Sequence, residues 1–250
     1  SLCIKSGNAV ILKGGKEAKH TTEIIISIIK SSLKETNIDP RAVTSLKDYS
    51  RDAFKALINM DQYIDVLVPR GGRSLIESIR RNSNIPIFSH LDGICHTYID
   101  RHAKKSMAIN ICFNAKMRRT SICGATETIL CHKEIAKDVL PNLIEKLNKY
   151  NCIVKGNSDI KKLNTNVRPI EEKDWSTEYL DSIVSIKIVS SLEAAISHIN
   201  YYSSGHTDAI ITEQPNTAKK FLAAINSAIV MHNTSTQFAD GAEFGLGAEI

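Results

Sequence analysis

The sequence predicts an α/β protein in which helices cover a parallel sheet. Short apolar runs of strand length alternate with longer amphipathic segments along the whole chain. Glycine- or proline-containing turns separate the two kinds of segment, which is typical of repeated strand–helix units. The chain has 250 residues, 42% of them hydrophobic. It can therefore bury a sizeable core, in one large domain or two modest ones.

The first third of the chain contains two such units. The apolar run 9–12 predicts a strand, and two glycines then turn the chain into a helix over 16–33. A helix is expected over 51–58. It is followed by a buried strand over 63–68 and a further helix over 74–81.

A second α/β region begins near residue 90. We expect a short strand followed by a loop within 84–100, and Asp100 is placed to cap a helix over 101–117. Further along, strands and helices alternate again, with strands at 182–190, 208–212 and 227–234 and helices at 191–202 and 215–226.

Charge and cysteine usage narrow the function classes. The formal net charge of +5 comes from interspersed lysines and glutamates, so a nucleic-acid partner is not indicated. No apolar run approaches the roughly 18 residues that a membrane-spanning helix needs. The six cysteines form no CxxC pair, and a chain of this size needs no disulfide framework. We therefore expect a cytoplasmic protein without a nucleic-acid or membrane partner.

One short stretch, AKMRRTSICGATETILCH, raises a chemical question. It places Cys123 beside a glycine and a few residues after Arg118 and Arg119. A cysteine of this kind can be a small buried hydrophobe or a nucleophile. The stretch alone leaves both alternatives open.

Five blocks of the sequence resemble, in the same order, segments of the gamma-glutamyl phosphate reductase (glutamate-5-semialdehyde dehydrogenase) family of the aldehyde dehydrogenase superfamily. They are KSGNAVILKGGKEA, VPRGGRSLI, SHLDGICHTYID, NAKMRRTSICGATETILCH and ADGAEFGLGAEI. The resemblance spans essentially the whole chain, which looks like a fragment that lacks an N-terminal part and a C-terminal tail of the family. It implies an aldehyde dehydrogenase-like fold. Residues 1–88 would form the remainder of a Rossmann-type NADP-binding domain, and residues 89–250 the catalytic domain.

The resemblance also implies roles around the cysteine. Cys123 falls at the family's nucleophile position, where a thiolate displaces phosphate from an acyl phosphate and holds the acyl group as a thioester. Arg118 and Arg119 would favour the thiolate or hold the anionic phosphate. Alternatively, the two arginines only cap or solvate the end of the preceding helix. Asn233 and the glycine-rich stretch 238–247 fall where the family shapes its substrate mouth.

Cofactor contacts follow from the same resemblance. Lys13, Gly14, Gly15 and Lys16 fall beside the adenosine ribose. Lys16 replaces the glutamate of NAD-preferring relatives, which favours NADP(H) because an ammonium attracts a 2′-phosphate.

Two further sites complete the expected cofactor contacts. Gly71 and Gly72 match a second glycine turn behind the cofactor, where backbone amides at a helix start are available to it. Glu178 matches the superfamily glutamate that holds the nicotinamide ribose.

The motif HLDGICH suggests a metal at first sight, because it contains His90, Cys95 and His96. A closed site needs a fourth ligand with a recognisable second pair, and none is visible, so no metal is expected. By the resemblance, His90 takes the place of the glutamate base of hydrolytic relatives. Loss of that carboxylate suits transfer to phosphate, because water must then be avoided.

The expected function is NADPH-dependent reduction of L-glutamyl 5-phosphate to glutamate-5-semialdehyde in proline biosynthesis, by a homo-oligomer. The superfamily's oxyanion-stabilising asparagine precedes the first strand, so a separate N-terminal segment would have to supply it. Two alternatives stay open: a non-catalytic remnant or interaction domain with weak dinucleotide affinity, and an unrelated dinucleotide-binding module.

Overall fold

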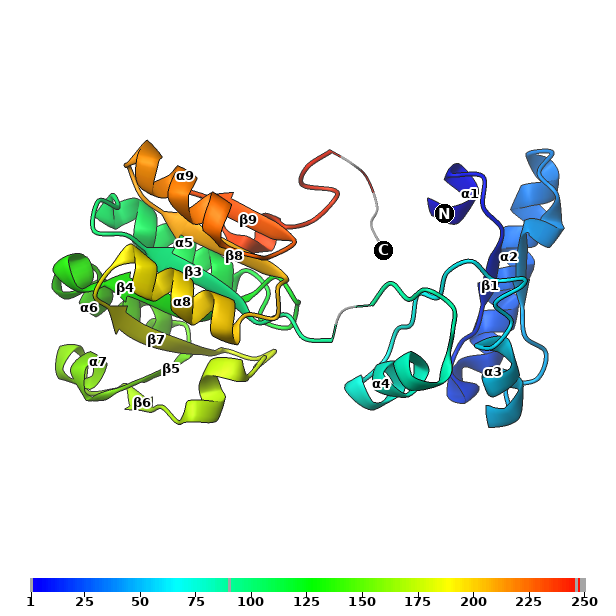
Figure 1. Ribbon diagram of the computed structural model, residues 1–250, viewed down its shortest axis with the longest axis horizontal. Coiled ribbons are helices and arrows are strands. Elements are labelled where there is room, and N and C mark those ends of the chain that lie inside the picture. The colour runs from blue at the N-terminus through cyan, green and yellow to red at the C-terminus, as the bar shows by residue number, and fades with distance from the viewer. Residues whose placement is uncertain (1, 90, 246, 248–250) are drawn as a thin grey trace. The chain divides into compact units, whose positions relative to one another are not determined.

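The computed structural model describes residues 2–89, 91–245 and 247. These residues form two compact units, one before and one after residue 90. Each unit is described by itself (Figure 1). Among the described residues, no helix combines the length and apolar character needed to cross a bilayer.

The first unit is built on a small parallel sheet of two strands, in which Val10 lies opposite Val43. The long helix α2 connects these strands and packs beside the sheet (Figure 1). The elements of the first unit are α1 (Leu2–Lys5), β1 (Val10–Leu12), η1 (Lys16–Ala18), α2 (Lys19–Glu35), η2 (Pro40–Ala42), β2 (Val43–Ser45), α3 (Arg51–Leu57) and α4 (Arg73–Asn82).

One expectation for this unit is wrong. Residues 63–68 do not form a buried strand, because Tyr63 and Val68 are exposed and only Leu67 makes a bridge, to Ile87. A strand is stabilised by a ladder of partners on its neighbours. Among the described residues of the unit this run has a single bridging partner, so apolar composition alone does not make it a strand.

The second unit contains a parallel sheet of seven strands in the order β6-β5-β7-β4-β3-β8-β9. A parallel sheet covered by helices confirms the expected α/β class. The elements are β3 (Cys95–Ile99), α5 (Lys105–Met117), β4 (Thr126–His132), α6 (Lys133–Lys149), β5 (Ile153–Gly156), α7 (Ser158–Leu163), β6 (Arg168–Pro169), η3 (Glu172–Ser176), β7 (Ile183–Val189), α8 (Leu192–Tyr202), β8 (Thr207–Ile211), α9 (Pro215–Ala224), β9 (Ile229–His232) and η4 (Thr236–Phe238).

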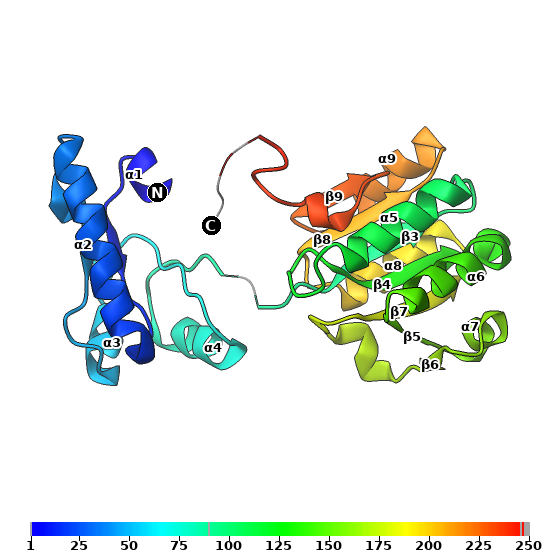
Figure 2. The same cartoon turned by 180° about the vertical axis from the view of Figure 1, so that it is seen from behind.

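Two hydrophobic clusters lie on opposite faces of this sheet. Successive side chains of a strand point to opposite faces, so Ile99 packs with α5 and α6 while its neighbour Tyr98 packs with α8 and α9. Figure 1 shows α8 and α9 on the near face, and Figure 2 shows α5 and α6 on the other. The central strands β3 and β4 are therefore buried on both sides, which fixes the segments at their ends.

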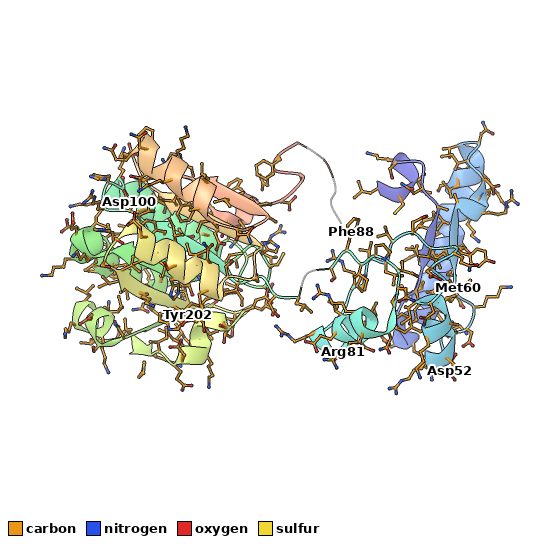
Figure 3. The ribbon with its side chains drawn as sticks, in the orientation of Figure 1. Asp52, Met60, Arg81, Phe88, Asp100 and Tyr202 are labelled. Carbon is orange, nitrogen blue, oxygen red and sulfur yellow. The ribbon has the colours of Figure 1, made fainter. Side chains whose placement is uncertain are left out.

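The structure corrects two expectations near β3. The stretch predicted as a loop forms a strand over Cys95–Ile99, and all five residues are buried. Asp100 does not cap the following helix, which begins at Lys105 without a side-chain cap. Its buried carboxylate instead accepts hydrogen bonds from the Thr212 hydroxyl at 2.8 Å and the His102 N–H at 3.2 Å. Figure 3 shows Asp100 at the carboxyl end of β3, where this polar network joins neighbouring strands.

Candidate active site

Loops that are far apart in the sequence lie together at one end of the large sheet, where the parallel strands begin; this end is called the amino edge below. All pairings in this sheet are parallel, so the segments that precede β3, β4, β7 and β8 reach the same edge. Cys123 lies in the loop between α5 and β4, and Glu178 precedes β7. The fold therefore brings two residues singled out in the sequence to one place.

The backbone of Cys123 is held closely from the strand next to it. Cys123 is half-buried, and its carbonyl oxygen accepts a hydrogen bond from the Cys95 thiol at an S···O distance of 3.1 Å. A Cβ atom on Gly93 would lie 2.3 Å from that same oxygen and 2.6 Å from the Cys123 Cα. The close approach requires glycine at position 93, and it fixes the backbone that carries the thiol.

Glu178 joins the same arrangement through Gly93. Its Oε1 accepts the Gly93 N–H at 2.9 Å. Gly93 therefore contacts the Cys123 backbone with its Cα and the Glu178 carboxylate with its N–H. A carboxylate is thus fixed on the loop beside the one that carries the thiol.

The two arginines have different environments. The Arg118 guanidinium forms an ion pair with Glu243 at 2.5 Å and lies over the ring of Phe238, 5.1 Å from the ring centre. These two contacts connect Phe238 and Glu243 of the glycine-rich stretch to the residue that begins the Cys123 loop. Both arginines are exposed. Arg118 is engaged by Glu243 and holds a neighbouring segment, whereas Arg119 has no ion-pair partner among the described residues, so its guanidinium is available to an anionic ligand.

The remaining cysteines of the second unit are poor nucleophiles. Burial raises the pKa of the Cys131 and Cys152 thiols to about 12, and it raises the pKa of Cys95 and Cys112 well above the usual range. A thiol that is protonated and enclosed at neutral pH does not attack substrates. Cys123, half-buried on the sheet edge, is the accessible thiol of this unit.

The HLDGICH motif is dispersed in the structure. The thiol of Cys95 contacts Cys123, while the His96 Nδ1 pairs with the carboxylate of Asp208 at 3.0 Å in the interior. His90 lies outside the described residues. Among the residues that the structure describes, no three His, Cys, Asp or Glu side chains are grouped to hold a metal ion.

Asn233 directly follows β9, so it lies where the strands of the sheet end, whereas Cys123 lies where they begin. Its side-chain oxygen accepts the Thr212 N–H at 2.9 Å, and its amide nitrogen donates to the Thr212 carbonyl at 3.0 Å. Both ends of the amide are thus used to join the ends of β8 and β9. The structure does not bring Asn233 together with Cys123.

In the first unit, the residues expected to contact a cofactor form a turn between β1 and η1. The Lys13 ammonium lies 5.2 Å from the centre of the Phe54 ring and donates to the Gly14 carbonyl at 3.3 Å. A Cβ on Gly14 would lie 2.3 Å from the Thr22 Oγ1, so the turn packs directly on α2. Lys16 is exposed at the start of η1. This turn exposes backbone and two cationic side chains.

Gly71 and Gly72 form the second glycine turn, directly before α4. Gly71 has a φ of 153°, and Gly72 is the N-cap of this ten-residue helix. Both glycines are exposed, so the first amides of α4 are accessible. A helix start of this kind suits an anionic group of a ligand.

Three residues at the edge of the large sheet were not identified from the sequence: Gly93, Lys116 and Glu127. Lys116 and Glu127 form an ion pair of 2.6 Å, and both side chains are buried. Lys116 lies in a helix and Glu127 in a strand, with a loop between them, so no helical or strand periodicity links the pair. The only available signal was a glutamate within an otherwise apolar and threonine-rich strand run.

Comparisons with known proteins agree with this architecture. The model of the aldehyde dehydrogenase family matches residues 2–163 and 165–247. The gamma-glutamyl phosphate reductase of Rhodospirillum rubrum is 47% identical over 250 residues, which are 100% of this chain and 58% of that protein.

Solved structures resemble the chain as well. A crystal structure of gamma-glutamyl phosphate reductase from Thermotoga maritima has a TM-score of 0.94 and 40% identity, and the match covers 99% of this chain and 60% of that one. An engineered glycolyl-CoA reductase with bound NADP⁺ has a TM-score of 0.70 at 17% identity over 98% of this chain and 62% of that one, a likeness of fold alone. The chain thus spans 58 to 60% of the length of these reductase relatives.

Proposed function

Because the chain belongs to the aldehyde dehydrogenase family, we propose that it acts in a gamma-glutamyl phosphate reductase. The reaction is NADPH-dependent reduction of L-glutamyl 5-phosphate to glutamate-5-semialdehyde, a step of proline biosynthesis. The observation that carries the proposal is the arrangement of Cys123, Gly93 and Glu178 at the amino edge of the large sheet. The 47% identity to a reductase relative supports the substrate class.

In this proposal Cys123 is the nucleophile. Its thiolate attacks the acyl carbon, the bond from that carbon to the phosphate oxygen breaks, and the acyl group remains on sulfur as a thioester. Arg119 attracts the anionic phosphate, because a guanidinium pairs with phosphate oxygens through two parallel hydrogen bonds. Arg118 contributes indirectly, since its pairing with Glu243 holds the glycine-rich stretch beside the loop. Asn233 has a structural role in this proposal, because its amide joins the carboxyl ends of β8 and β9.

The described residues fit a nicotinamide dinucleotide. In the first unit, Lys13, Gly14, Gly15 and Lys16 form a cationic turn in which Gly14 packs closely on Thr22, whose Oγ1 would lie 2.3 Å from a Cβ added at Gly14. Gly71 and Gly72 expose the first amides of α4 to the pyrophosphate.

Glu178 in the second unit would accept hydrogen bonds from the nicotinamide ribose. The bound cofactor supplies the hydride that releases the aldehyde from sulfur. Lys16 favours NADP(H), since its ammonium attracts a 2′-phosphate.

The cellular setting completes the proposal. A thiol nucleophile among five other cysteines suits the reducing cytoplasm. We propose small-molecule substrates, a homo-oligomeric assembly and, where the remaining part of the fold comes from another polypeptide, a separate N-terminal segment. No step requires a nucleic-acid or membrane partner.

The test is phosphate-dependent NADP⁺ reduction with glutamate-5-semialdehyde, measured in the reverse direction because the acyl phosphate is labile. The chain is assayed alone and mixed with the remaining part of a relative's polypeptide, since the chain spans 60% of the Thermotoga maritima reductase. We expect weak activity alone and strong activity in the mixture. Cys123→Ser should lower the activity by about 10³-fold or more, whereas Cys152→Ser should retain it. No activity in the mixture would favour a non-catalytic remnant.

Calorimetry tests the cofactor preference. The unmodified chain should bind NADP⁺ at least about tenfold more tightly than NAD⁺, a difference of about 1.4 kcal/mol. Lys16→Glu should reverse this order, because a carboxylate repels the 2′-phosphate and accepts hydrogen bonds from a ribose hydroxyl. Lys30→Glu on α2 is a control that changes charge away from the turn. Equal affinities for both cofactors in the unmodified chain would contradict the assignment.

A further inference from the structure

A buried ion pair lies behind the Cys123 loop. The Lys116 Nζ and the Glu127 Oε2 are 2.6 Å apart, and the side chains are 0% and 1% exposed. Enclosing two charges is costly, and a buried pair gains little stability over apolar residues of similar size. The position of the pair in the fold therefore indicates what it does.

The pair closes the base of the loop that carries Cys123. Lys116 lies in the last turn of α5, and Glu127 is the second residue of β4. The loop between these two elements contains Cys123. The ion pair joins the two ends of this loop, so it restricts the paths that the loop can take.

Glu127 also reaches the segment that carries Glu178. Its second oxygen, Oε1, accepts the Leu180 N–H at 3.4 Å. Leu180 has a φ of 51°, in the left-handed region that a residue with a branched side chain rarely adopts. Such a conformation persists only where surrounding contacts impose it. The bond from Leu180 to Glu127 is one of these contacts.

Tyr179 adds a second contact between the pair and this segment. The Lys116 ammonium lies 5.9 Å from the centre of the Tyr179 ring, and the Lys155 ammonium lies 5.3 Å from it. The Tyr179 hydroxyl is fixed by the Ser185 hydroxyl at 2.8 Å. Residues 179 and 180 are therefore held by the ion pair through both a ring and a backbone amide.

Glu178 connects this segment back to Cys123 through Gly93. It directly precedes these two residues, and its carboxylate accepts the Gly93 N–H at 2.9 Å. The Gly93 Cα lies against the Cys123 backbone. The ion pair thus holds the Cys123 loop directly at its base and the Glu178 carboxylate through the adjoining turn.

We propose that Lys116 and Glu127 are positioning residues that fix the Glu178 carboxylate relative to the Cys123 loop. The inference rests on the proposed function for the chemical roles of Cys123 and Glu178. Neither Lys116 nor Glu127 touches substrate or cofactor in this scheme. Burial raises the pKa of the Glu127 carboxyl to about 7 against the opposing effect of Lys116, so Glu127→Gln resembles a state that the side chain can reach by protonation.

Amide hydrogen exchange tests the coupling in the full 250-residue chain. The variants are Lys116→Met and Glu127→Gln, and Leu143→Ala on α6 is the control for general loss of core packing. In both variants the amides of Gly93 and Leu180 should exchange about tenfold faster, while the amides within β7 keep their rates. The double variant Lys116→Met/Glu127→Gln should accelerate exchange of the Gly93 and Leu180 amides no more than either single change does, because the two residues act as one unit. In the Leu143→Ala control, the exchange rates of the Gly93 and Leu180 amides should change no more than those of the β7 amides.

Kinetics give a second measurement in the complemented enzyme. Mispositioned groups slow the chemical step, so kcat should fall about tenfold in Glu127→Gln while the KM for the semialdehyde stays within about twofold. If Lys116→Met does not fold, Glu127→Gln, which preserves the side-chain shape, carries the test.

The possible outcomes separate the positioning role of Lys116 and Glu127 from the proposed function of the chain. Unchanged exchange at Gly93 in Glu127→Gln, or a uniform rise over the whole sheet, would overturn the positioning role. A local rise with an unchanged kcat would restrict the pair to a structural role and also overturn the proposal. A local rise in a chain whose Cys123→Ser variant retains full activity would contradict the proposed function and leave the coupling between the loops intact.

Discussion

At the scale of single residues, contacts between distant positions decide how Cys123 is held. Cys123 was identified from its sequence neighbourhood and the family resemblance, but Gly93, which lies thirty residues earlier, was not. The two meet only because β3 and β4 are neighbours in a parallel sheet. A glycine that is needed for a close backbone approach has the same sequence signal as a glycine in a turn.

Replacing Gly93 by alanine tests this contact. The added Cβ would lie 2.3 Å from the Cys123 carbonyl oxygen, which is backbone and has little room to yield. Gly93→Ala should lower the free energy of unfolding of the second unit by about 2 kcal/mol and should reduce activity as strongly as loss of the nucleophile does. Urea denaturation and the reverse assay measure the two effects.

Gly72→Ala, in the first unit, is the control for the stability effect alone, because Gly72 belongs to the proposed cofactor turn. A Cβ there meets nothing within 4 Å, so the free energy of unfolding should change by less than about 1 kcal/mol. If Gly93→Ala behaved like this control, the close approach would not be what holds Cys123.

At the scale of elements, the sequence is informative where the pattern is local. The structure confirms helices at Lys19–Glu35, Arg73–Asn82, Leu192–Tyr202 and Pro215–Ala224, because each has an amphipathic repeat. The strand β3 was missed, since a strand buried on both faces has no alternation and this one contains His96 and Thr97. The supposed strand over 63–68 shows the reverse error, because apolar composition does not supply strand partners.

The helix α8 carries a histidine whose titration should be visible in stability. His198 is buried, and its Nδ1 accepts a hydrogen bond from the Lys187 ammonium at 3.0 Å. Burial, together with the Lys187 charge and then His96, lowers the pKa of His198 from 6.5 to about 3. The unfolded chain therefore binds more protons than the folded chain between these pH values, and stability falls as the pH falls.

The expected loss of unfolding free energy from this one residue is about 2 kcal/mol between pH 7 and pH 5. His198→Gln should remove that contribution, because the amide oxygen can still accept from Lys187 but does not titrate in this range. Urea denaturation at several pH values measures the slope. His20→Gln, at an exposed site on α2, should keep the wild-type slope. An unchanged slope in His198→Gln would contradict the assignment.

At the scale of the whole molecule, the two units differ in how much apolar surface they enclose. The α/β class was predicted from the alternation of segments, but the unequal size of the sheets was not, since strand pairing depends on contacts between distant segments. The first unit has a sheet of two strands, whereas the second has seven. Ile24, Ile28 and Phe88 in the first unit are 60%, 61% and 68% exposed. The side chains of Met60 and Phe88 are labelled in Figure 3.

This difference predicts unfolding in two steps, with the first unit unfolding at lower denaturant concentration. A two-stranded sheet is marginally stable, and exposed isoleucines contribute little burial energy to hold it. The single tryptophan of the chain, Trp175, lies buried in the second unit. Its fluorescence therefore follows only that unit, while far-ultraviolet circular dichroism follows both. The dichroism should begin to decrease at a urea concentration where the fluorescence is still native.

Two core variants assign the steps. Leu143→Ala, on α6 in the second unit, should shift the fluorescence transition to lower urea by removing buried apolar volume, and should leave the first step of the dichroism unchanged. Ile26→Ala, on α2 in the first unit, should move only that first step. If both signals instead changed together in the unmodified chain and in both variants, the chain would unfold as one cooperative body.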